Sequence, residues 1–378
     1  MGKPIIRILT IRSPPRLSQR NMTRRHSIAL ATLVALTVIT TISADAQTSW
    51  VSAQRNSPPT TGQGLGRATP ADPARVVGHD ACVKCHASEV KVWQTTPHAT
   101  TFDQLHRTPE AKQIASKLGL RSIKHSGRCV ACHYTTQSDP SANGPDASPH
   151  VVAGVSCESC HGAAKDWLDL HHHYGGQSVT RLTESPAHRA ERITTSIQAG
   201  MRNPTNLYLV AQSCLRCHTT ADEELVNVGG HPAGSLDFEF VSWSQGTIRH
   251  NFVNSDGKSN ATRSPEQLRV MFVAGMIAEL EASLRATAIA TQKATFAITV
   301  AQRADRAKKR LQSVAAKVDQ PILNQILDVV AGVRLKLNNE AELTAAADEI
   351  ASLGYRFAAE CDGNGLSSLD PFIPTGRK

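Results

Sequence analysis

One pentapeptide decides the fold, and it occurs four times: CVKCH at residues 82–86, CVACH at 129–133, CESCH at 157–161 and CLRCH at 214–218. Cys-x-x-Cys-His is the attachment signature of c-type haem. Its two thiols form thioethers with one porphyrin, and the histidine that follows is held beneath the iron as the proximal ligand. The sequence therefore predicts four covalently bound c-type haems.

The repetition of this motif gives the predicted site residues directly. The predicted thioether cysteines are Cys82, Cys85, Cys129, Cys132, Cys157, Cys160, Cys214 and Cys217. The predicted proximal iron ligands are His86, His133, His161 and His218. A single motif of this kind also fits a zinc knuckle or a redox dithiol, but neither requires a histidine directly after every Cys-x-x-Cys.

Histidine is also abundant enough to fill the sixth position of each iron. Eleven more histidines follow residue 46: His79, His98, His106, His125, His150, His171, His172, His173, His188, His231 and His250. Methionine, the other common axial ligand of cytochromes c, occurs there only at Met201, Met271 and Met276. We therefore predict bis-histidine coordination, which leaves no open position on the iron for a substrate.

Two segments beside the motifs resemble the tetrahaem cytochrome c-554 family. They are WQTTPHA at residues 93–99 and GVSCESCHG at residues 154–162, and the resemblance covers residues 77–250. Members of that family are periplasmic proteins known as electron acceptors of hydroxylamine oxidoreductase. The resemblance implies an electron-transfer protein with closely packed haems.

The family pattern also implies where the distal ligands lie. It assigns His98 to the third haem, His171 (the first of a run of three histidines) to the fourth, and His231 or His250 to the first. The well-known member leaves its second haem five-coordinate, but the presence of both later histidines allows this chain to close that site. His125, just before the second motif, is a rival ligand. The predicted distal set is His98, His171, His231 and His250.

The N-terminal segment reads as an export signal. Arg24 and Arg25 precede an apolar stretch at residues 28–42, and Ala44-Asp45-Ala46 offers a cleavage site. This predicts a signal peptide at residues 1–46, with Met22 as an alternative start, and a periplasmic protein that is soluble after cleavage. The stretch is short for a membrane span.

Removal of this segment would lower the net positive charge of the protein. The whole chain has a formal net charge of +9, but from residue 47 onward 34 basic residues face 31 acidic ones. The basic balance therefore does not indicate nucleic-acid binding, and no nucleic-acid-binding module is present. Residues 47–76 are rich in Ser, Pro, Thr and Gly, which predicts a disordered linker.

The C-terminal part has a different pattern. Residues 264–360 contain no histidine and carry apolar stripes of helical period. A capping box at Ser264 predicts one helix, and further helices are predicted to start near Pro321 and after Asn339. The predicted fold is mainly α: an irregular, loop-rich tetrahaem domain at residues 77–260, then an antiparallel α-helical hairpin or bundle extension at 261–378.

Two features of this extension allow more than one interpretation. A basic run, made of Arg303, Arg306, Lys308, Lys309 and Arg310, is interpreted as a solvated helix face, with the steering of an acidic partner as the alternative. Cys361, the ninth cysteine, is predicted to be a free buried thiol, with an intermolecular disulfide as the alternative. Alanine-rich helix faces leave open a contact with a second copy or a larger complex.

The favoured function is a periplasmic electron carrier between a donor oxidoreductase and a membrane or periplasmic acceptor. The alternative is an oxidoreductase that acts on a small nitrogen species, such as nitric oxide or hydroxylamine, at one five-coordinate haem. A third reading is a haem subunit docked into a larger complex. We favour the carrier because the chain has more than enough histidines to fill the distal position of all four irons. No catalytic residue is predicted.

Overall fold

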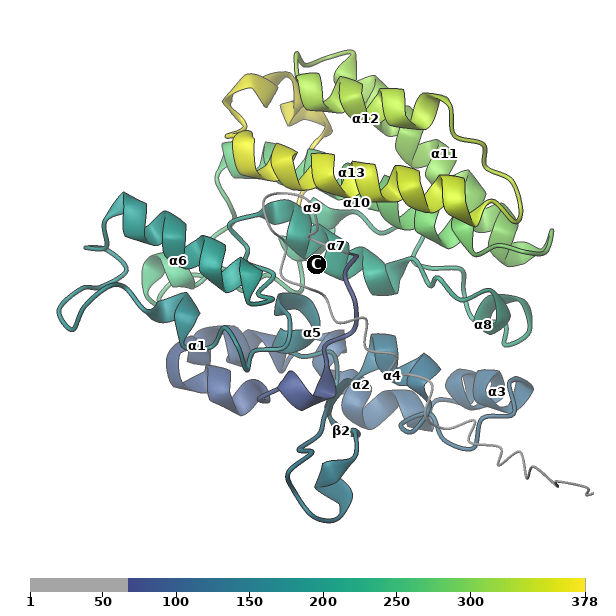
Figure 1. Ribbon diagram of the computed structural model, residues 1–378, viewed down its shortest axis with the longest axis horizontal. Helices are drawn as coiled ribbons and strands as arrows, with labels where there is room; N and C mark the ends of the chain where they lie inside the picture. The colour runs from purple at the N-terminus through teal and green to yellow at the C-terminus, as the bar shows by residue number, and fades with distance from the viewer. Residues whose placement is uncertain (1–66, 378) are drawn as a thin grey trace, which may run out of the picture. The chain divides into compact units, whose positions relative to one another are not determined.

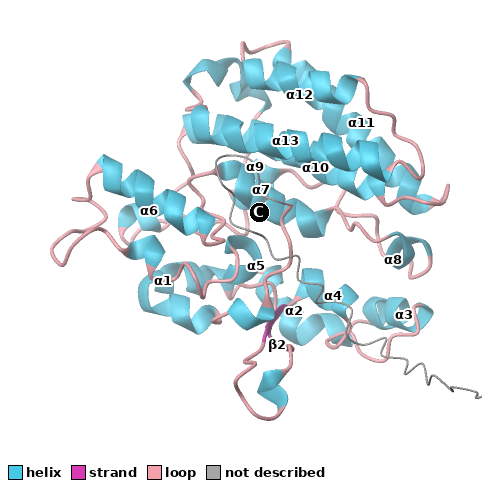
Figure 2. Ribbon diagram, viewed as in Figure 1, coloured by secondary structure: helices cyan, strands magenta, loops and turns pink. Residues whose placement is uncertain are grey.

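Helices carry all four motifs in the computed structural model, which describes residues 67–377. The first nine helices are α1 (His79–Trp93), α2 (Pro97–Gln104), α3 (Pro109–Lys117), α4 (Gly127–His133), α5 (Cys157–His161), α6 (Pro186–Gln198), α7 (Leu207–His218), α8 (Glu223–Asn227) and α9 (Phe240–Ser244). The last four are α10 (Pro265–Ala288), α11 (Thr295–Ala315), α12 (Pro321–Ala331) and α13 (Glu340–Glu360). The predicted mainly α, loop-rich fold is confirmed (Figure 2).

Strand structure in the described residues is limited to one short ladder. Strand β1 (Thr135–Gln137) pairs antiparallel with β2 (His150–Ala153), with Thr136 opposite Val151. The ladder joins the end of the second motif to the segment that leads into the third. Six short 3-10 helices fill the connections: Pro73–Arg75, Leu105–Arg107, Pro145–Ala147, Leu170–His172, Val253–Ser255 and Asn364–Phe372.

Each haem motif occupies a helical turn that stops at its histidine. Helices α4, α5 and α7 all end at the motif histidine, and α1 breaks its helical geometry at His86, where φ is −117° and ψ is 38°. Because residues three apart lie on the same side of a helix, each pair of cysteines faces one way. The local sequence therefore fixes two thiols and one imidazole as a unit.

The four motif helices pack in an order that differs from their order in the chain. Helix α1 contacts α5, α5 contacts α7, and α7 contacts α4 (Figure 1). The motifs therefore follow one another in the order first, third, fourth, second. At the two ends of this row, cysteines of different motifs are neighbours: Cys82 lies beside Cys157, and Cys132 beside Cys217.

The C-terminal helices begin where the sequence predicts. Helix α10 starts at Pro265, and its cap Ser264 accepts a hydrogen bond from the backbone N–H of Gln267 at 3.3 Å. The predicted starts of α12 and α13 are likewise confirmed. Helix α11 is an additional element between them, so α10 packs against both α11 and α13 (Figure 1).

One hydrophobic core joins these helices to the fourth haem motif. The core of α10–α13 also contains Leu207, Tyr208, Ala211 and Leu215 from α7. The boundary predicted near residue 260 therefore falls inside a single packed core.

Nearer the N-terminus, Ala68 and Val76 are buried, so the fold begins inside the segment predicted as a linker. The predicted signal peptide at residues 1–46 lies outside the described residues.

A single glycine allows α13 to approach α7 closely. A Cβ atom at Gly354 would stand 2.4 Å from Cε2 of Tyr208, closer than packed atoms tolerate. Tyr208 is 1% exposed and donates a hydrogen bond to Glu281 of α10 at 2.6 Å, so its ring has little room to move.

We therefore expect Gly354→Ala to lower the free energy of unfolding by about 1–3 kcal/mol through overpacking. Denaturant unfolding followed by far-UV circular dichroism measures this. Gly332→Ala is the matched control, because a Cβ there meets no atom within 4 Å and the backbone has an ordinary helical φ of −89°. Equal stability of the two variants would contradict the proposed contact.

Candidate functional site: four facing histidine pairs

Every motif histidine faces one other histidine across a nearly constant gap. The ring centroids of His86 and His171 are 6.3 Å apart. The three other pairs are each separated by 6.2 Å, and they are His98 with His218, His133 with His231, and His161 with His250. The eight residues come from the motif helices, from α2, from the 3-10 helix Leu170–His172 and from two loops, yet they converge on one separation.

This separation is the one that a shared metal ion requires. A metal–imidazole bond is about 2.0–2.1 Å long, so two such bonds plus the radii of two rings place the centroids roughly 6 Å apart. Packing between aromatic rings allows a wider range of about 4.5–7 Å, so it does not by itself select this value. In each pair, two thiols sit on the same helical turn as one of the histidines. The donor set therefore fits a c-type haem with two axial imidazoles.

Hydrogen bonds to Nδ1 orient most of these rings. The Nδ1 atoms of His161, His171, His231 and His250 lie 3.3, 2.5, 2.8 and 2.7 Å from the backbone carbonyl oxygens of Arg202, Leu168, Pro232 and Ile248. A carbonyl only accepts, so Nδ1 must carry the proton, and Nε2 is left with a lone pair for a metal. His218 is held instead through the Ser235 hydroxyl at 2.9 Å.

Burial keeps the rings in the neutral form that ligates metals. It lowers the pKa values of His133, His161 and His218 to about 4, and it also lowers those of His98 and His171. Neutral imidazole is the ligand form, so these rings need lose no proton on metal binding at neutral pH. Burial likewise raises the pKa of the Cys160 thiol to about 11.

The structure pairs the four histidines of the predicted distal set with motif histidines, but not with the partners that the family pattern implied. His98 faces His218 of the fourth motif rather than the third, and His171 faces the first motif rather than the fourth. His231 and His250 face the second and third motifs, respectively, so neither belongs to the first. These ring pairs differ from the implied assignment because pairing depends on how distant segments pack, which spacing along the chain does not fix.

The two segments that carry the family resemblance lie against each other. The indole N–H of Trp93 donates to the carbonyl of Val155 at 2.8 Å, and the N–H of Val155 donates to the carbonyl of His98 at 2.9 Å. A Cβ at Gly154 would stand 2.4 Å from that same His98 carbonyl, so only glycine permits this approach. The start of the third motif therefore positions the histidine that faces the fourth.

Glu158, inside the third motif, was not predicted to have a role. Its side chain is 1% exposed, and its carboxylate accepts hydrogen bonds from the backbone N–H groups of Val77, Gly78 and Ala164 at 2.8–2.9 Å. The first two donors immediately precede α1, which carries the first motif. Glu158 therefore fixes the first motif relative to the third. The only sequence signal was an acidic residue between two haem cysteines.

Arg202 makes the corresponding link between the third and fourth motifs. Its main-chain N–H donates to the carbonyl of His161 at 2.8 Å. Its guanidinium donates to Gln212 and Ser213 of α7, each at 2.6 Å, and to the Leu209 carbonyl. Burial lowers the Arg202 pKa to about 10, so the side chain remains charged at neutral pH.

The loop that carries His171 is anchored by a buried ion pair. Arg192 of α6 donates to the His171 carbonyl at 2.6 Å and pairs with Glu184, whose side chain is fully buried. His188 adds a hydrogen bond to Glu184 at 2.7 Å. These bonds, with that from Arg192 as the main cause, lower the Glu184 pKa to about 2.

Seven histidines remain among the described residues: His79, His106, His125, His150, His172, His173 and His188. None of them forms a ring pair with a motif histidine in the part of the chain that the structure describes. His125, the rival ligand, instead lies 2.9 Å from the Ser122 hydroxyl. His172 bonds the Leu168 carbonyl beside His171 and faces no motif.

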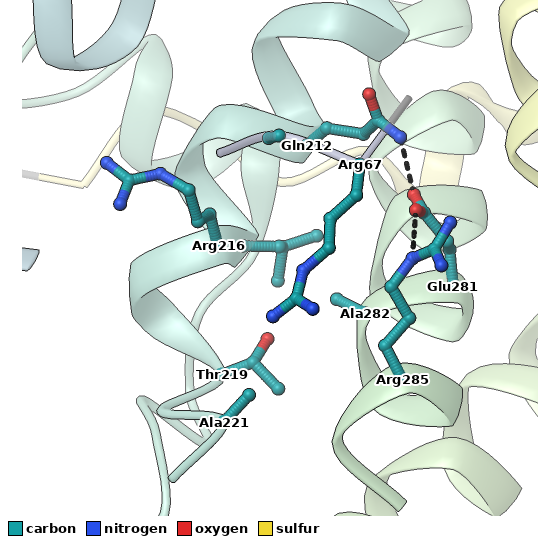
Figure 3. A pocket seen from close by; sticks show the side chains of 10 residues that line it. Arg67, Gln212, Arg216, Thr219, Ala221, Glu281, Ala282 and Arg285 are labelled. Carbon is teal, nitrogen blue, oxygen red and sulfur yellow. Dashed lines mark hydrogen bonds and ion pairs between the residues drawn. The ribbon is translucent and has the colours of Figure 1, made fainter. Parts of the chain in front are cut away.

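A small cavity lies between α7 and α10, next to the fourth motif (Figure 3). Arg67, Arg216 and Arg285 line it together with Gln212 and Glu281. Glu281 accepts from Gln212 at 2.7 Å and from Arg285 at 2.8 Å, and these are the bonds drawn in Figure 3.

Further contacts account for some of these charges. Arg216 reaches from the fourth motif to the carbonyl of Ala131 in the second, at 2.5 Å. Burial and the neighbouring Arg285 lower the Arg67 pKa. The cavity is therefore lined by Arg216 of the fourth motif, which also contacts the second motif, and by residues of α10.

Two further properties concern residues 67–377 alone. They contain no cluster of three or more histidine, cysteine or acidic side chains arranged around one metal ion. Their helices include none with the length and apolar character of a membrane span. Cys361 is a half-buried free thiol whose pKa is raised by burial.

Part of the chain is similar to known proteins. Residues 81–162 match the family described as cytochrome c554 and c-prime. The chain is 28% identical over 118 residues to cytochrome c-554 of Nitrosomonas europaea, which covers 31% of this chain and 48% of that protein. The chain thus spans about half the length of this relative. No solved structure matches the chain significantly.

We expect Glu158→Gln to destabilise the fold by about 1–3 kcal/mol, because an amide leaves at least one of the three buried donors without an acceptor. Thermal unfolding measures this loss. Glu110→Gln on α3 is the control, since that side chain is exposed. A change no larger than that of the control would contradict the role of Glu158.

The Glu184 pair predicts a pH dependence of stability. The folded pKa of about 2 lies below the ordinary value of 4.5, so the stabilisation is present above pH 4.5 and is lost as the pH falls towards 2. The difference in Tm between the wild type and Glu184→Gln should therefore be constant near neutrality and shrink in that acid window. Glu191→Gln, at the exposed neighbour of Arg192, is the control. A difference that does not vary with pH would refute this assignment.

Proposed function

Because the segment at residues 81–162 belongs to the cytochrome c-554 family, we propose that the chain is a tetrahaem c-type cytochrome that carries electrons between a redox enzyme and a downstream acceptor. The observation that carries this proposal is the set of four facing histidine pairs, each separated by 6.2–6.3 Å. The family match covers three complete motifs and not the fourth, so the number four rests on the repeated motif and on these pairs.

The residues proposed to hold each haem follow from the pairs. The first would use Cys82, Cys85, His86 and His171; the second Cys129, Cys132, His133 and His231; the third Cys157, Cys160, His161 and His250; the fourth Cys214, Cys217, His218 and His98. When bound, these haems supply reversible one-electron iron chemistry. The chain itself contributes fixed imidazoles, apolar burial and a set order of motifs.

The packing order supports a carrier with two ends. The first and second motifs lie at the ends of the row formed by α1, α5, α7 and α4. At the first end, Cys85 is exposed and Val83 is 38% exposed. We propose that a redox partner protein contacts the chain beside the first motif. Redox partners typically bind through small transient interfaces, which need no deep pocket.

The same pairs weigh against the enzymatic alternative. Catalysis on nitric oxide or hydroxylamine at the iron would need a motif histidine without a facing ligand. Among residues 67–377 each motif histidine faces a second histidine, and His133 of the second motif faces His231. Export to the periplasm is part of the proposal and rests on the signal-like sequence at residues 1–46.

The ligand assignment is tested by replacing the distal histidines one at a time. His98→Ala, His171→Ala, His231→Ala and His250→Ala should each convert one of four low-spin ferric haems to high spin, because one axial imidazole is lost. Electron paramagnetic resonance measures the spin state, and mass spectrometry should find all four haems still attached, since the thioethers are untouched.

His172→Ala is the matched control, because this neighbour of His171 faces no motif histidine. It should leave all four haems low-spin. A high-spin haem in the wild-type protein would overturn the carrier in favour of an open-site enzyme. A secreted protein without covalent haem would refute the whole assignment.

A further inference from the structure

The most deeply buried charged side chain of the C-terminal helices touches a haem motif. Arg303 of α11 is 1% exposed. It donates through Nη1 to the carbonyl of His218 at 2.8 Å and through Nε to Glu279 of α10 at 3.1 Å. The interpretation of Arg303 as part of a solvated helix face is therefore wrong. It packs inward because Glu279 and the His218 carbonyl supply partners inside the fold.

His218 is enclosed on several sides by residues from beyond its own helix. Ser235 donates its N–H to the His218 carbonyl and places its hydroxyl 2.9 Å from the Nδ1 atom. Phe238 stacks on the imidazole at 4.7 Å, and Trp243 meets it edge-on at 5.2 Å. These residues lie outside the family match at residues 81–162. These contacts to His218 therefore come from the C-terminal half of the chain.

The positive charge of Arg303 is incompletely compensated within the fold. Its counter-ion Glu279 also binds Arg310 at 2.9 Å, so two guanidinium groups share one carboxylate. The Nη2 atom of Arg303 is buried and has no hydrogen-bond partner among the described residues. The nearby Glu239 is committed to capping α9, where it accepts from two backbone N–H groups. Water screens a charge poorly at such a buried position.

We propose that Arg303 is a positioning and potential-setting residue for the haem of the fourth motif. It holds the backbone of the proximal histidine, and its positive charge disfavours the oxidised iron, which carries one more positive charge than the reduced iron. The reduction potential of this haem is therefore higher than it would be beside a neutral residue. The inference rests on the proposed function, because it requires a haem at His218.

The test uses the full-length secreted protein with its haems attached. Arg303→Gln should lower the midpoint potential of one haem in spectroelectrochemical titration and leave the other three unchanged. That haem is identified as the one whose low-spin signal is lost in His98→Ala. Arg303→Lys, which retains the charge, should restore most of the potential, whereas a purely structural role would not depend on charge.

Arg310→Gln is the matched control. Arg310 binds the other oxygen of Glu279 but is 39% exposed and does not touch His218, so its loss should leave all four potentials near their wild-type values. If Arg303→Gln does not fold, the double variant Arg303→Gln with Glu279→Gln also removes the carboxylate that Arg303 binds. It should still lower the potential, though by less.

Two results would overturn the inference: an unchanged fourth potential in the variants without Arg303, or an equal shift in Arg310→Gln. The proposed function fails in a different way. Mass spectrometry of the wild type would then show fewer than four haems, or its resonance spectrum would contain a high-spin haem. The two failures are therefore distinguishable in the same preparations.

Discussion

The separation between facing imidazoles is the constraint on which the rest of this structure depends. Four histidine pairs, drawn from segments far apart in the chain, all have ring centroids 6.2–6.3 Å apart. Packed aromatic rings have centroid separations of about 4.5–7 Å, so mutual packing alone would not hold four unrelated pairs at one value. The apolar cluster around the second motif is small compared with the core of α10–α13. A fold with so little apolar core around its motifs needs bulky groups between those rings, which agrees with the low aromatic content of 4%.

The parts of this arrangement that could be predicted from the sequence are those encoded locally. The local sequence of a Cys-x-x-Cys-His motif fixes the relative positions of its two thiols and its imidazole, because all three lie on one helical turn. The starts of α10, α12 and α13 follow from Ser264, Pro321 and Asn339, where the sequence itself marks the beginning of a helix. The pairing of His98 with His218 is different. It depends on the contact between Val155 and the His98 carbonyl, which no local pattern encodes.

Burial of charge was the other property that sequence patterns could not supply. The basic run at residues 303–310 looks like a solvated face because most such runs are. Lys309 fits that expectation, being exposed and paired with Asp305 one turn away. Arg303 departs from it because Glu279, on another helix, offers a buried acceptor. Glu158 and Arg202 follow the same rule, since each owes its role to partners that only the tertiary structure brings near.

The interactions that position the motifs relative to one another are mostly hydrogen bonds to backbone groups. Side chains as different as glutamate and arginine can therefore serve the same purpose. Glu158 binds the N–H groups ahead of α1, Arg202 binds the carbonyl of His161 with its own main chain, and Arg303 binds that of His218. Backbone groups are present whatever the side chain, so such links survive sequence change between the motifs. Charged donors and acceptors make these bonds stronger than neutral ones, and burial keeps water from competing. Because α7 shares its core with α10–α13, the packing of the C-terminal helices also helps to position the fourth motif.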